Sequence, residues 1–428
     1  MNQSRIKGLS NALVNIFFIP LIVIAILGSL SLIIPNFLAM NNVAVKITVG
    51  LLFLVFFVII SHPIRAFFKK IVVQVLVYLT KYRRLVILIL IFLILCWQLA
   101  IVYLLSGDHA FDTKTVMYTV LFGVGSSQIY YSTYPNMILL FFIERSLWLI
   151  TGQPGLEYFV IYLNLVNLVL IDSGILILGS TVRRLFGKSY LSVFYLMSCL
   201  LFILSPWVAV PYSDTWAFFL TALSLYLGTS YFQSTKSLAK YVYATLSGIV
   251  LIFAYLIKPP LVITFIAVGI VCLFRKLATK NLRLSKVVMI SMLLFGTGTI
   301  ATFTTYQWFL DHQTVLENNT KMAHPMTHFI AMGMHGTGAY YQPDMEMDLK
   351  IKSPRKRQEA NIKLIKQRFS DFNGISNYGK FLVQKQLNNT ADGTFSWGAD
   401  VLKVSNHANS VTRNRTLIRR LFAKQGVT

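Results

Sequence analysis

Long apolar runs recur along this sequence and leave few folds open to it. Several of them approach the roughly 20 consecutive apolar residues that an α-helix needs to cross a bilayer. Charged residues make up only 13% of the 428 residues, whereas soluble domains carry roughly 25%. Because a backbone inside lipid must satisfy its own hydrogen bonds, these runs predict an all-α polytopic membrane protein.

The strong positive charge fits the same architecture. The formal net charge is +24, and Lys and Arg cluster at the ends of the apolar runs. Such clusters are typical of cytoplasmic loops that contact anionic lipid, so membrane lipids are expected partners and nucleic acid is not. The three cysteines, Cys96, Cys199 and Cys272, lie inside apolar runs and are interpreted as buried hydrophobic residues, not as disulfides or metal ligands.

The distribution of Lys and Arg also predicts a topology. Arg5 and Lys7 precede the first apolar run, which is too long for a signal-peptide core, and they place the N-terminus in the cytoplasm. The remaining basic loops then place the C-terminus outside. The predicted spans number about nine and lie at about 12–38, 45–62, 85–106, 158–182, 190–207, 216–232, 241–257, 261–274 and 287–306.

Three regions follow from this topology. Residues 1–84 hold the first two spans and a cytoplasmic interfacial segment, and residues 85–306 form the transmembrane core with an outer loop at 107–157. Residues 307–428 are mostly polar and contain no apolar run long enough to span, so they are expected to be extracytoplasmic. Here Glu359 to Arg368 predict a short amphipathic helix, and the rest is expected to form loops and short strands.

The segment 135–152 allows two interpretations, because Glu144 and Arg145 interrupt its apolar sequence. If it crosses the membrane, the basic cluster at 183–188 falls outside. If it lies in the outer interface, that cluster is cytoplasmic and the later loops obey the positive-inside rule. We favour a juxtamembrane helix with Glu144 and Arg145 on its water-facing side. A true span with an internal Glu–Arg pair remains the alternative.

Candidate catalytic acids occur where the third span leaves the membrane. Asp108 and Asp112 follow the apolar run that ends near Leu105, and Tyr134 and Asn136 belong to a tyrosine-rich segment shortly afterwards. A carboxylate at the lipid boundary can remove the proton of a hydroxyl group while that group attacks a membrane-borne donor. Asp112 also precedes a predicted helix at Thr113, so it can instead be an ordinary N-cap. The tyrosines can instead form an aromatic belt.

Two further charged residues lie on the same predicted face. Lys258 ends the seventh span, and Asp214 begins the sixth. A lysine at a helix exit can balance the charge of a phosphate leaving group. It can equally be a residue that extends its ammonium group to the membrane surface, and Asp214 can simply cap its helix.

Short motifs in this arrangement resemble a known family. Asp112 in an outer loop, Tyr134-Pro-Asn136 about two dozen residues later and Arg183-Arg-Leu-Phe-Gly187 after the next span resemble the protein O-mannosyltransferase-like glycosyltransferases of the GT-C fold. Four more motifs resemble a bacterial subgroup of these integral membrane proteins: Pro211-Tyr-Ser-Asp-Thr215, Ile257-Lys-Pro259, Gly338-Ala-Tyr-Tyr341 and Asp392-Gly-Thr-Phe-Ser-Trp397. The resemblance covers roughly residues 85 to 400.

The resemblance implies an inverting hexosyltransferase in the plasma membrane of a bacterium. It would transfer a sugar from a polyprenyl-phosphate donor to an extracytoplasmic glycan, lipid or protein, with Asp112 as the base. Lys258 would hold the donor phosphate, and Asp108, Tyr134, Asn136, Asp214 and Arg145 are the other candidate contacts of donor or acceptor. A divalent metal is compatible with this chemistry, and no other cofactor is implied.

The chain departs from the family pattern in two ways. Two additional spans precede the loop with Asp112, and the sequence stops at Thr428, where family members usually continue into further membrane helices. A truncated or inactive product is therefore one expectation.

Two other functional classes remain open. A transporter of polyprenyl-linked lipids or glycans would place polar residues inside its spans, as Asn164, Asn167 and Asp172 are predicted to lie. The same residues are equally suited to hydrogen bonds between helices. The third class is a non-catalytic subunit of a polysaccharide assembly machine.

Overall fold

The computed structural model describes residues 3–39, 81–107, 111–278, 285–317 and 319–390. Several predictions fall outside these ranges: the second span at 45–62, most of the cytoplasmic interfacial segment, Asp108, and the motif at 392–397.

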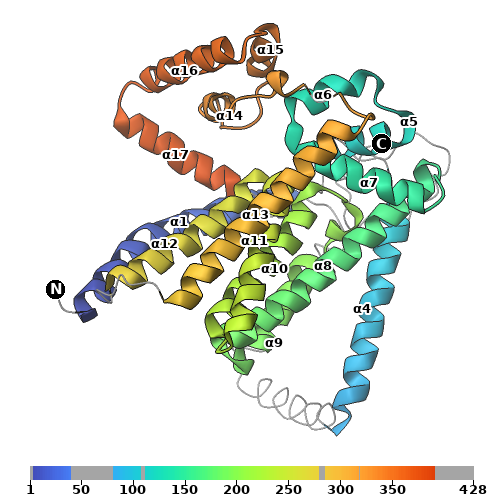
Figure 1. Ribbon diagram of the computed structural model, residues 1–428, viewed down its shortest axis with the longest axis vertical. Coiled ribbons are helices and arrows are strands. Elements are labelled where there is room, and N and C mark those ends of the chain that lie inside the picture. The colour runs from blue at the N-terminus through green and yellow to red at the C-terminus, as the bar shows by residue number, and fades with distance from the viewer. Residues whose placement is uncertain (1–2, 40–80, 108–110, 279–284, 318, 391–428) are drawn as a thin grey trace.

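All regular secondary structure in the described ranges is helical (Figure 1). The helices of the membrane region and outer loop are α1 (Gln3–Ala39), α4 (Arg83–Leu105), α5 (Phe111–Phe122), α6 (Gln128–Thr133), α7 (Ile138–Ile150), α8 (Leu156–Phe186), α9 (Leu191–Ser198), α10 (Ser213–Gln233), α11 (Ser237–Ile257), α12 (Val262–Ala278) and α13 (Lys286–His312). The C-terminal region adds α14 (Met326–Met332), α15 (Gln342–Lys350), α16 (Pro354–Asp371) and α17 (Ile375–Thr390). Short connecting turns are η1 (Gly125–Ser127), η2 (Pro135–Met137), η3 (Lys188–Tyr190), the π-helical η4 (Cys199–Ile203), η5 (Pro206–Ala209), η6 (Pro259–Leu261) and η7 (Thr320–Met322).

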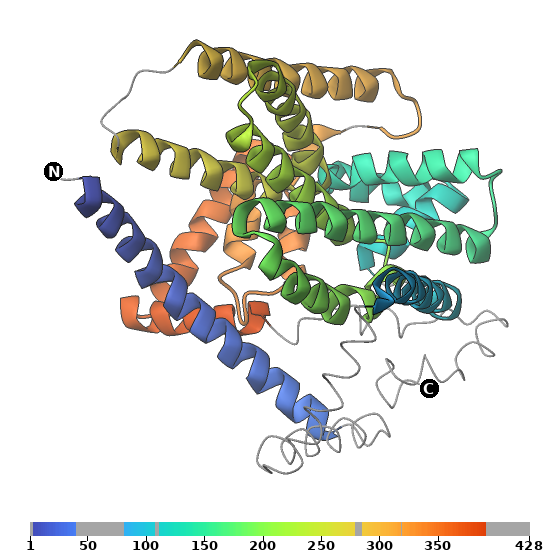
Figure 2. The same cartoon turned by 90° about the horizontal axis from the view of Figure 1, so that it is seen from below.

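The centre of the protein is a bundle in which α8 packs on α10, α10 on α11 and α11 on α13 (Figures 1 and 2). Glycines allow the closest of these contacts. A Cβ atom at Gly248 would clash with the carbonyl of Phe295, and one at Gly298 would clash with the carbonyl of Thr245. Small residues at the interface let α11 and α13 approach closely, which is how helices commonly associate in membranes.

Five described helices are long and apolar enough to cross a membrane. These candidate spans are Val14–Ser31 within α1, Arg83–Leu105, Leu156–Phe186, Ser237–Ile257 and Lys286–His312. Three more predicted spans are helical but fall short of this length or apolar character. The apolar segments Lys188–Ile203 and Pro259–Phe274 are shorter, and α10 is long enough but rich in Ser, Thr and Tyr. The fold is therefore that of an integral membrane protein with several apolar helices.

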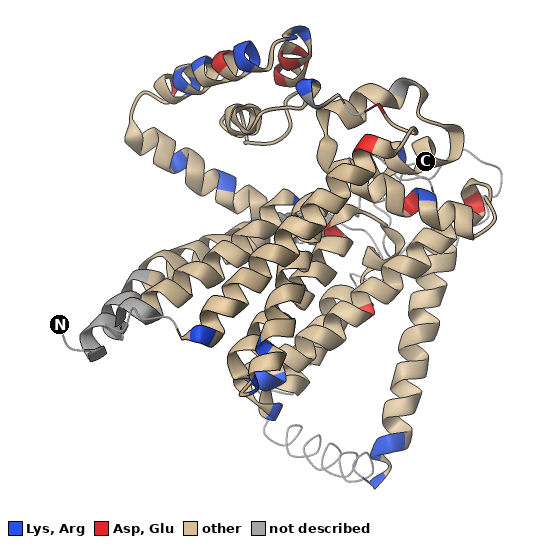
Figure 3. Ribbon diagram, viewed as in Figure 1, with Lys and Arg blue, Asp and Glu red and all other residues tan. Residues whose placement is uncertain are grey.

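Basic residues mark one end of the bundle (Figure 3). Lys and Arg lie there at the ends of long helices, whereas the opposite end, with the C-terminal helices, carries acidic and basic residues together. Contacts tie the basic end together: the Arg184 guanidinium donates hydrogen bonds to the Ser230 and Tyr226 hydroxyls, at 3.0 and 3.1 Å. Basic residues at the ends of apolar helices are the feature that the positive-inside rule uses to predict a cytoplasmic side.

The structure makes α7 too short to span. Its 13 residues extend over roughly 20 Å, whereas the hydrocarbon core is about 30 Å thick. However, the prediction that Glu144 faces water is wrong, because its exposed fraction is only 3%. Leu140 and Phe141, one helical turn earlier, are fully buried, so Glu144 lies on the side of α7 that packs into the protein.

Glu144→Gln is expected to stabilise the protein at neutral and alkaline pH. Burial raises the pKa of the Glu144 carboxyl well above its usual value, and Oε2 is buried with no hydrogen-bond partner among the described residues. In the unfolded chain the carboxyl loses its proton above about pH 4.3, whereas in the folded chain it retains it, so stability falls as the pH rises above that value. Glutamine has no proton to lose in this pH range, so its contribution to stability does not fall as the pH rises.

The melting temperature in detergent, measured from pH 4 to pH 8, tests this expectation. The advantage of the glutamine variant should grow with pH, while Asp311→Asn, at an exposed acid, should show no such trend. A difference that does not change with pH would contradict a protonated Glu144.

The helix predicted at Glu359 to Arg368 is confirmed within α16, but the loops and short strands expected around it are wrong for most of residues 326–390, where the described chain forms three further helices. The signals for their starts are local: Pro343 and Pro354 occupy first turns, and the Ser353 hydroxyl accepts a hydrogen bond from the Lys356 backbone at 3.5 Å. Helix α17 also packs against α1, so the two ends of the described chain meet (Figure 2).

Candidate functional site

The first functional feature is the carboxylate of Asp112. It lies in the first turn of α5 and is half-buried. The Tyr212 hydroxyl donates a hydrogen bond of 2.7 Å to Asp112 Oδ2. Tyr212 directly precedes α10, so this contact joins the outer loop to a residue one hundred positions later in the chain.

Lys258 and Asp214 lie against the same tyrosine. Lys258 Nζ forms an ion pair with Asp214 Oδ1 and lies 5.6 Å from the centre of the Tyr212 ring. The side chains of Lys258 and Asp214 are 32% and 25% exposed. Asp112, Tyr212, Asp214 and Lys258 therefore form one connected group, which we call the acidic–lysine cluster. It combines a carboxylate with a cation at a partly water-accessible place.

The structure changes the helix-capping and membrane-anchoring roles that the sequence left open for these residues. Helix α5 begins at Phe111, so Asp112 is inside its first turn and does not cap a helix starting at Thr113. Asp214 is likewise within the first turn of α10, whose N-terminus has no side-chain cap. Lys258 ends α11, and its ammonium group is paired with Asp214. Both carboxylates are still near helix N-termini, where the helix dipole favours negative charge.

Several half-buried tyrosines lie near Asp112. Burial, and then the negative charge of Asp112, raise the pKa of the Tyr130 and Tyr212 hydroxyls. Burial is also the main reason that the pKa of Tyr134 rises to about 12, with smaller effects from Tyr340 and Asp112. These phenols keep their protons at all physiological pH values, so Tyr212 serves Asp112 as a donor and never competes with it for a proton.

The other predicted site residues are less closely connected. Tyr134 ends α6, and its hydroxyl points to the Met345 sulfur at 3.6 Å. Asn136 in η2 and Arg145 on α7 are half-buried, and no hydrogen bond or ion pair within the described ranges links either side chain to the acidic–lysine cluster. Asp108 lies outside the described residues.

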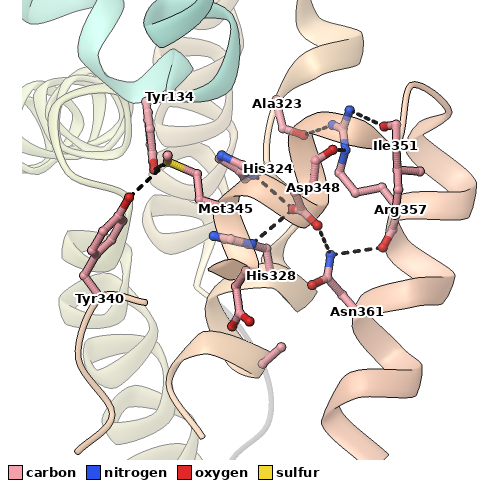
Figure 4. Close-up of polar contacts among 12 residues, drawn as sticks. Tyr134, Ala323, His324, His328, Tyr340, Met345, Asp348, Ile351, Arg357 and Asn361 are labelled. Carbon is pink, nitrogen blue, oxygen red and sulfur yellow. Dashed lines mark hydrogen bonds and ion pairs between the residues drawn. The ribbon is translucent and has the colours of Figure 1, made fainter. Parts of the chain in front are cut away.

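A second group of polar residues lies in the C-terminal region beside Tyr134 (Figure 4). His324 Nδ1 and His328 Nδ1 lie 3.0 and 3.1 Å from Asp348 Oδ2, and all three side chains are at most 1% exposed. The His324 ring lies 5.2 Å from that of Tyr134. We call these three residues the histidine–aspartate group.

The histidine–aspartate group was missed by the sequence analysis. Burial alone would raise the pKa of Asp348, but hydrogen bonds from His324 and Asn361 and the close contact of His328 hold that pKa well below its usual range. The Arg357 guanidinium supports the arrangement by donating to four backbone carbonyls, those of Lys321, Ala323, Asp348 and Ile351. A sequence signal did exist, because His324 and His328 are four residues apart, but Asp348 comes from another helix.

Polar residues within the spans form hydrogen bonds between elements. Gln98 Nε2 on α4 donates to Asp172 Oδ1 on α8 at 2.8 Å, and Asn164 Nδ2 donates to the Ser106 hydroxyl at 2.7 Å. Asn167 Nδ2 donates to three carbonyls of the η5 turn and the residue after it, Trp207, Val208 and Val210. These side chains therefore form hydrogen bonds between neighbouring elements, which is one of the two roles predicted for them from the sequence.

Comparison with known proteins identifies the chain at the level of a family. No curated protein and no solved structure matches it. A family model described as a conserved hypothetical integral membrane protein matches residues 6–426. This match spans almost the entire sequence and agrees with the apolar helices described above. The chain therefore belongs to this family of conserved hypothetical integral membrane proteins.

Proposed function

We propose that this protein is a membrane-embedded glycosyltransferase that moves a sugar from a polyprenyl-phosphate donor to an extracytoplasmic acceptor. The observation that carries the proposal is the acidic–lysine cluster: the Asp112 carboxylate accepts a hydrogen bond from the Tyr212 hydroxyl, and the Lys258 ammonium group lies over the ring of the same tyrosine. Transfer from a lipid phosphate requires a base for the acceptor and a cation for the leaving group. The resemblance of the surrounding motifs to GT-C glycosyltransferases supports the same chemistry.

In the proposed reaction, Asp112 removes the proton of an acceptor hydroxyl as its oxygen attacks the anomeric carbon of the donor sugar. The bond from that carbon to the phosphate oxygen breaks, and the electron pair leaves with the polyprenyl phosphate. Direct attack inverts the anomeric configuration. Lys258 would exchange its ion pair with Asp214 for the donor phosphate, whose oxygens accept the same kind of charge-assisted hydrogen bond from the ammonium group.

A donor screen with the purified protein is the direct test. Several polyprenyl-phosphate hexoses are incubated with the protein in detergent or lipid nanodiscs, with water and simple sugars as acceptors. Release of polyprenyl phosphate that depends on Asp112 supports the proposal. Binding of a donor without any release, in wild type and Asp112→Asn alike, would favour the transporter or the accessory subunit instead.

The proposed topology has about nine spans, a cytoplasmic N-terminus and an extracytoplasmic C-terminal region. The acidic–lysine cluster would then face the outer side. Single cysteines at Thr235, in the basic loop before α11, and at Gln367, on α16, provide the test in a chain without its three native cysteines. An impermeant maleimide should label position 367 in intact cells and position 235 only after permeabilisation. The reverse pattern would overturn the arrangement.

A further inference from the structure

Two tyrosine hydroxyls from distant parts of the chain meet at one methionine (Figure 4). Tyr134 follows α6, and Tyr340 lies shortly before α15 in the C-terminal region. Their hydroxyls point to the Met345 sulfur, at 3.6 and 3.2 Å. A thioether sulfur is only a weak acceptor, and among the described residues it is the acceptor for both hydroxyls. The two phenols can therefore form better hydrogen bonds with a ligand that carries hydroxyl groups of its own.

The aromatic ring of Tyr340 is open as well. Its exposed fraction is 59%, and no other ring within the described ranges stacks on it. The neighbouring Tyr341 differs, because its ring stacks on His335 at 3.7 Å and lies 5.8 Å from the Arg368 guanidinium. Tyr341 therefore anchors the loop to the C-terminal helices, whereas Tyr340 presents a free aromatic face.

Glycines fix the shape of the loop that carries Tyr340. Gly336 and Gly338 have φ values of 54° and 82°, which other residues rarely adopt. The Lys385 ammonium group on α17 donates a hydrogen bond of 2.6 Å to the Gly333 carbonyl, and a Cβ atom at Gly338 would clash with the Lys385 side chain. The loop thus has a defined shape before any ligand binds, which lowers the entropy lost on binding.

This loop comes near the acidic–lysine cluster. Burial, then the charge of Glu346 and then the charge of Asp112 raise the pKa of the Tyr340 hydroxyl. Tyr134 connects the two places, because its ring lies 5.3 Å from that of Tyr130, whose pKa is raised by burial and by the charge of Asp112. The C-terminal region therefore brings an exposed aromatic ring within electrostatic range of the proposed base.

We propose that Tyr340 and Tyr134 form a subsite that binds a saccharide acceptor beside Asp112. One face of a pyranose ring is lined with C–H groups, which pack favourably on the electron-rich face of an aromatic ring. The two phenol hydroxyls would bond to hydroxyl groups of the sugar. This inference rests on the proposed function and narrows its acceptor from a glycan, lipid or protein to a glycan.

The acceptor KM of the full chain tests the subsite, with methyl glycosides of glucose, galactose and mannose as acceptors. Tyr340→Ala should raise this KM about tenfold, because the stacked ring and the apolar area that it covers are both lost. Tyr340→Phe keeps the ring and should raise the KM less. The donor Kd and the release of polyprenyl phosphate to water should not change in either variant. Phe369→Ala, which removes an exposed ring on α16 outside the subsite, is the matched control and should behave as the wild type.

Saturation-transfer NMR with the same methyl glycosides, without donor, measures binding alone. Protons on one face of the sugar ring should receive saturation from the wild type and from Phe369→Ala, and much less from Tyr340→Ala. This result without any release of polyprenyl phosphate would support the saccharide subsite and overturn the proposed glycosyl transfer. Release with an unchanged acceptor KM in Tyr340→Ala would overturn the subsite and leave glycosyl transfer standing. A wild type that transfers no saturation to any of the three sugars would also overturn the subsite.

Discussion

Asp112→Asn is expected to abolish glycosyl transfer while leaving the protein folded and able to bind donor. Asparagine keeps an oxygen that can accept the hydrogen bond from the Tyr212 hydroxyl, so the connection between α5 and the segment before α10 survives. The amide cannot take a proton from an acceptor hydroxyl. A general base contributes about a hundredfold to ten-thousandfold in rate, whereas a contact at a helix start contributes only about 1 kcal/mol to stability.

The measurement is the initial rate of polyprenyl-phosphate release, together with the melting temperature and the donor Kd of each variant. Asp311→Asn, at an exposed acid near the end of α13, is the control and should keep the wild-type rate. Asp108→Asn should be milder than Asp112→Asn. If Asp112→Asn releases the product at nearly the wild-type rate, Asp112 is not the base.

A substitution at Tyr212 tests whether its hydroxyl group positions Asp112 or takes part in the reaction itself. Tyr212→Phe keeps the ring beneath Lys258 and removes only the hydroxyl that donates to Asp112. Without this donor the carboxylate loses the hydrogen bond that orients it, although it can still accept a proton. We therefore expect a smaller loss in rate than for Asp112→Asn.

Lys258→Ala is expected to weaken donor binding about tenfold to a hundredfold. Hydrogen bonds to charged groups contribute roughly 1.5–3 kcal/mol, and each 1.4 kcal/mol corresponds to a factor of ten in Kd. A lysine that only anchors the protein at the membrane surface would contribute much less. Lys258→Arg should retain part of the affinity, because the charge survives although the compact ammonium group is lost.

The ion pair with Asp214 requires a control of its own, because Lys258→Ala also leaves that carboxylate without its partner. The double variant Lys258→Ala/Asp214→Asn removes both charges. If Lys258 holds the donor phosphate, the double variant binds donor as weakly as Lys258→Ala. Recovery of wild-type affinity in the double variant would show that Lys258 serves only to neutralise Asp214. Lys240→Ala, at the opposite end of α11, should leave the Kd unchanged.

Local sequence patterns were enough to predict an all-α membrane protein and the positions of many of its long helices. The predicted span at about 85–106 corresponds to α4, and the one at about 241–257 to α11. These predictions succeed because a long apolar run has few alternatives: inside lipid its backbone must form its own hydrogen bonds. Pro135 also indicated where the next helical segment begins, because proline suits a first turn. It lies in the first turn of η2, which leads directly into α7.

Which side chains come into contact could be seen only from the way the helices pack. Tyr212 reaches Asp112 across 100 positions, Lys258 reaches Asp214 across 44, and His324 reaches Asp348 across 24. The burial of Glu144 is a further example. Periodicity identifies the apolar face of α7, but it does not show which neighbouring helices cover the residues at the edge of that face. Hydrophobic runs specify local conformation, whereas contacts between distant residues depend on how helices pack, and that packing is set by side-chain fit over the entire bundle.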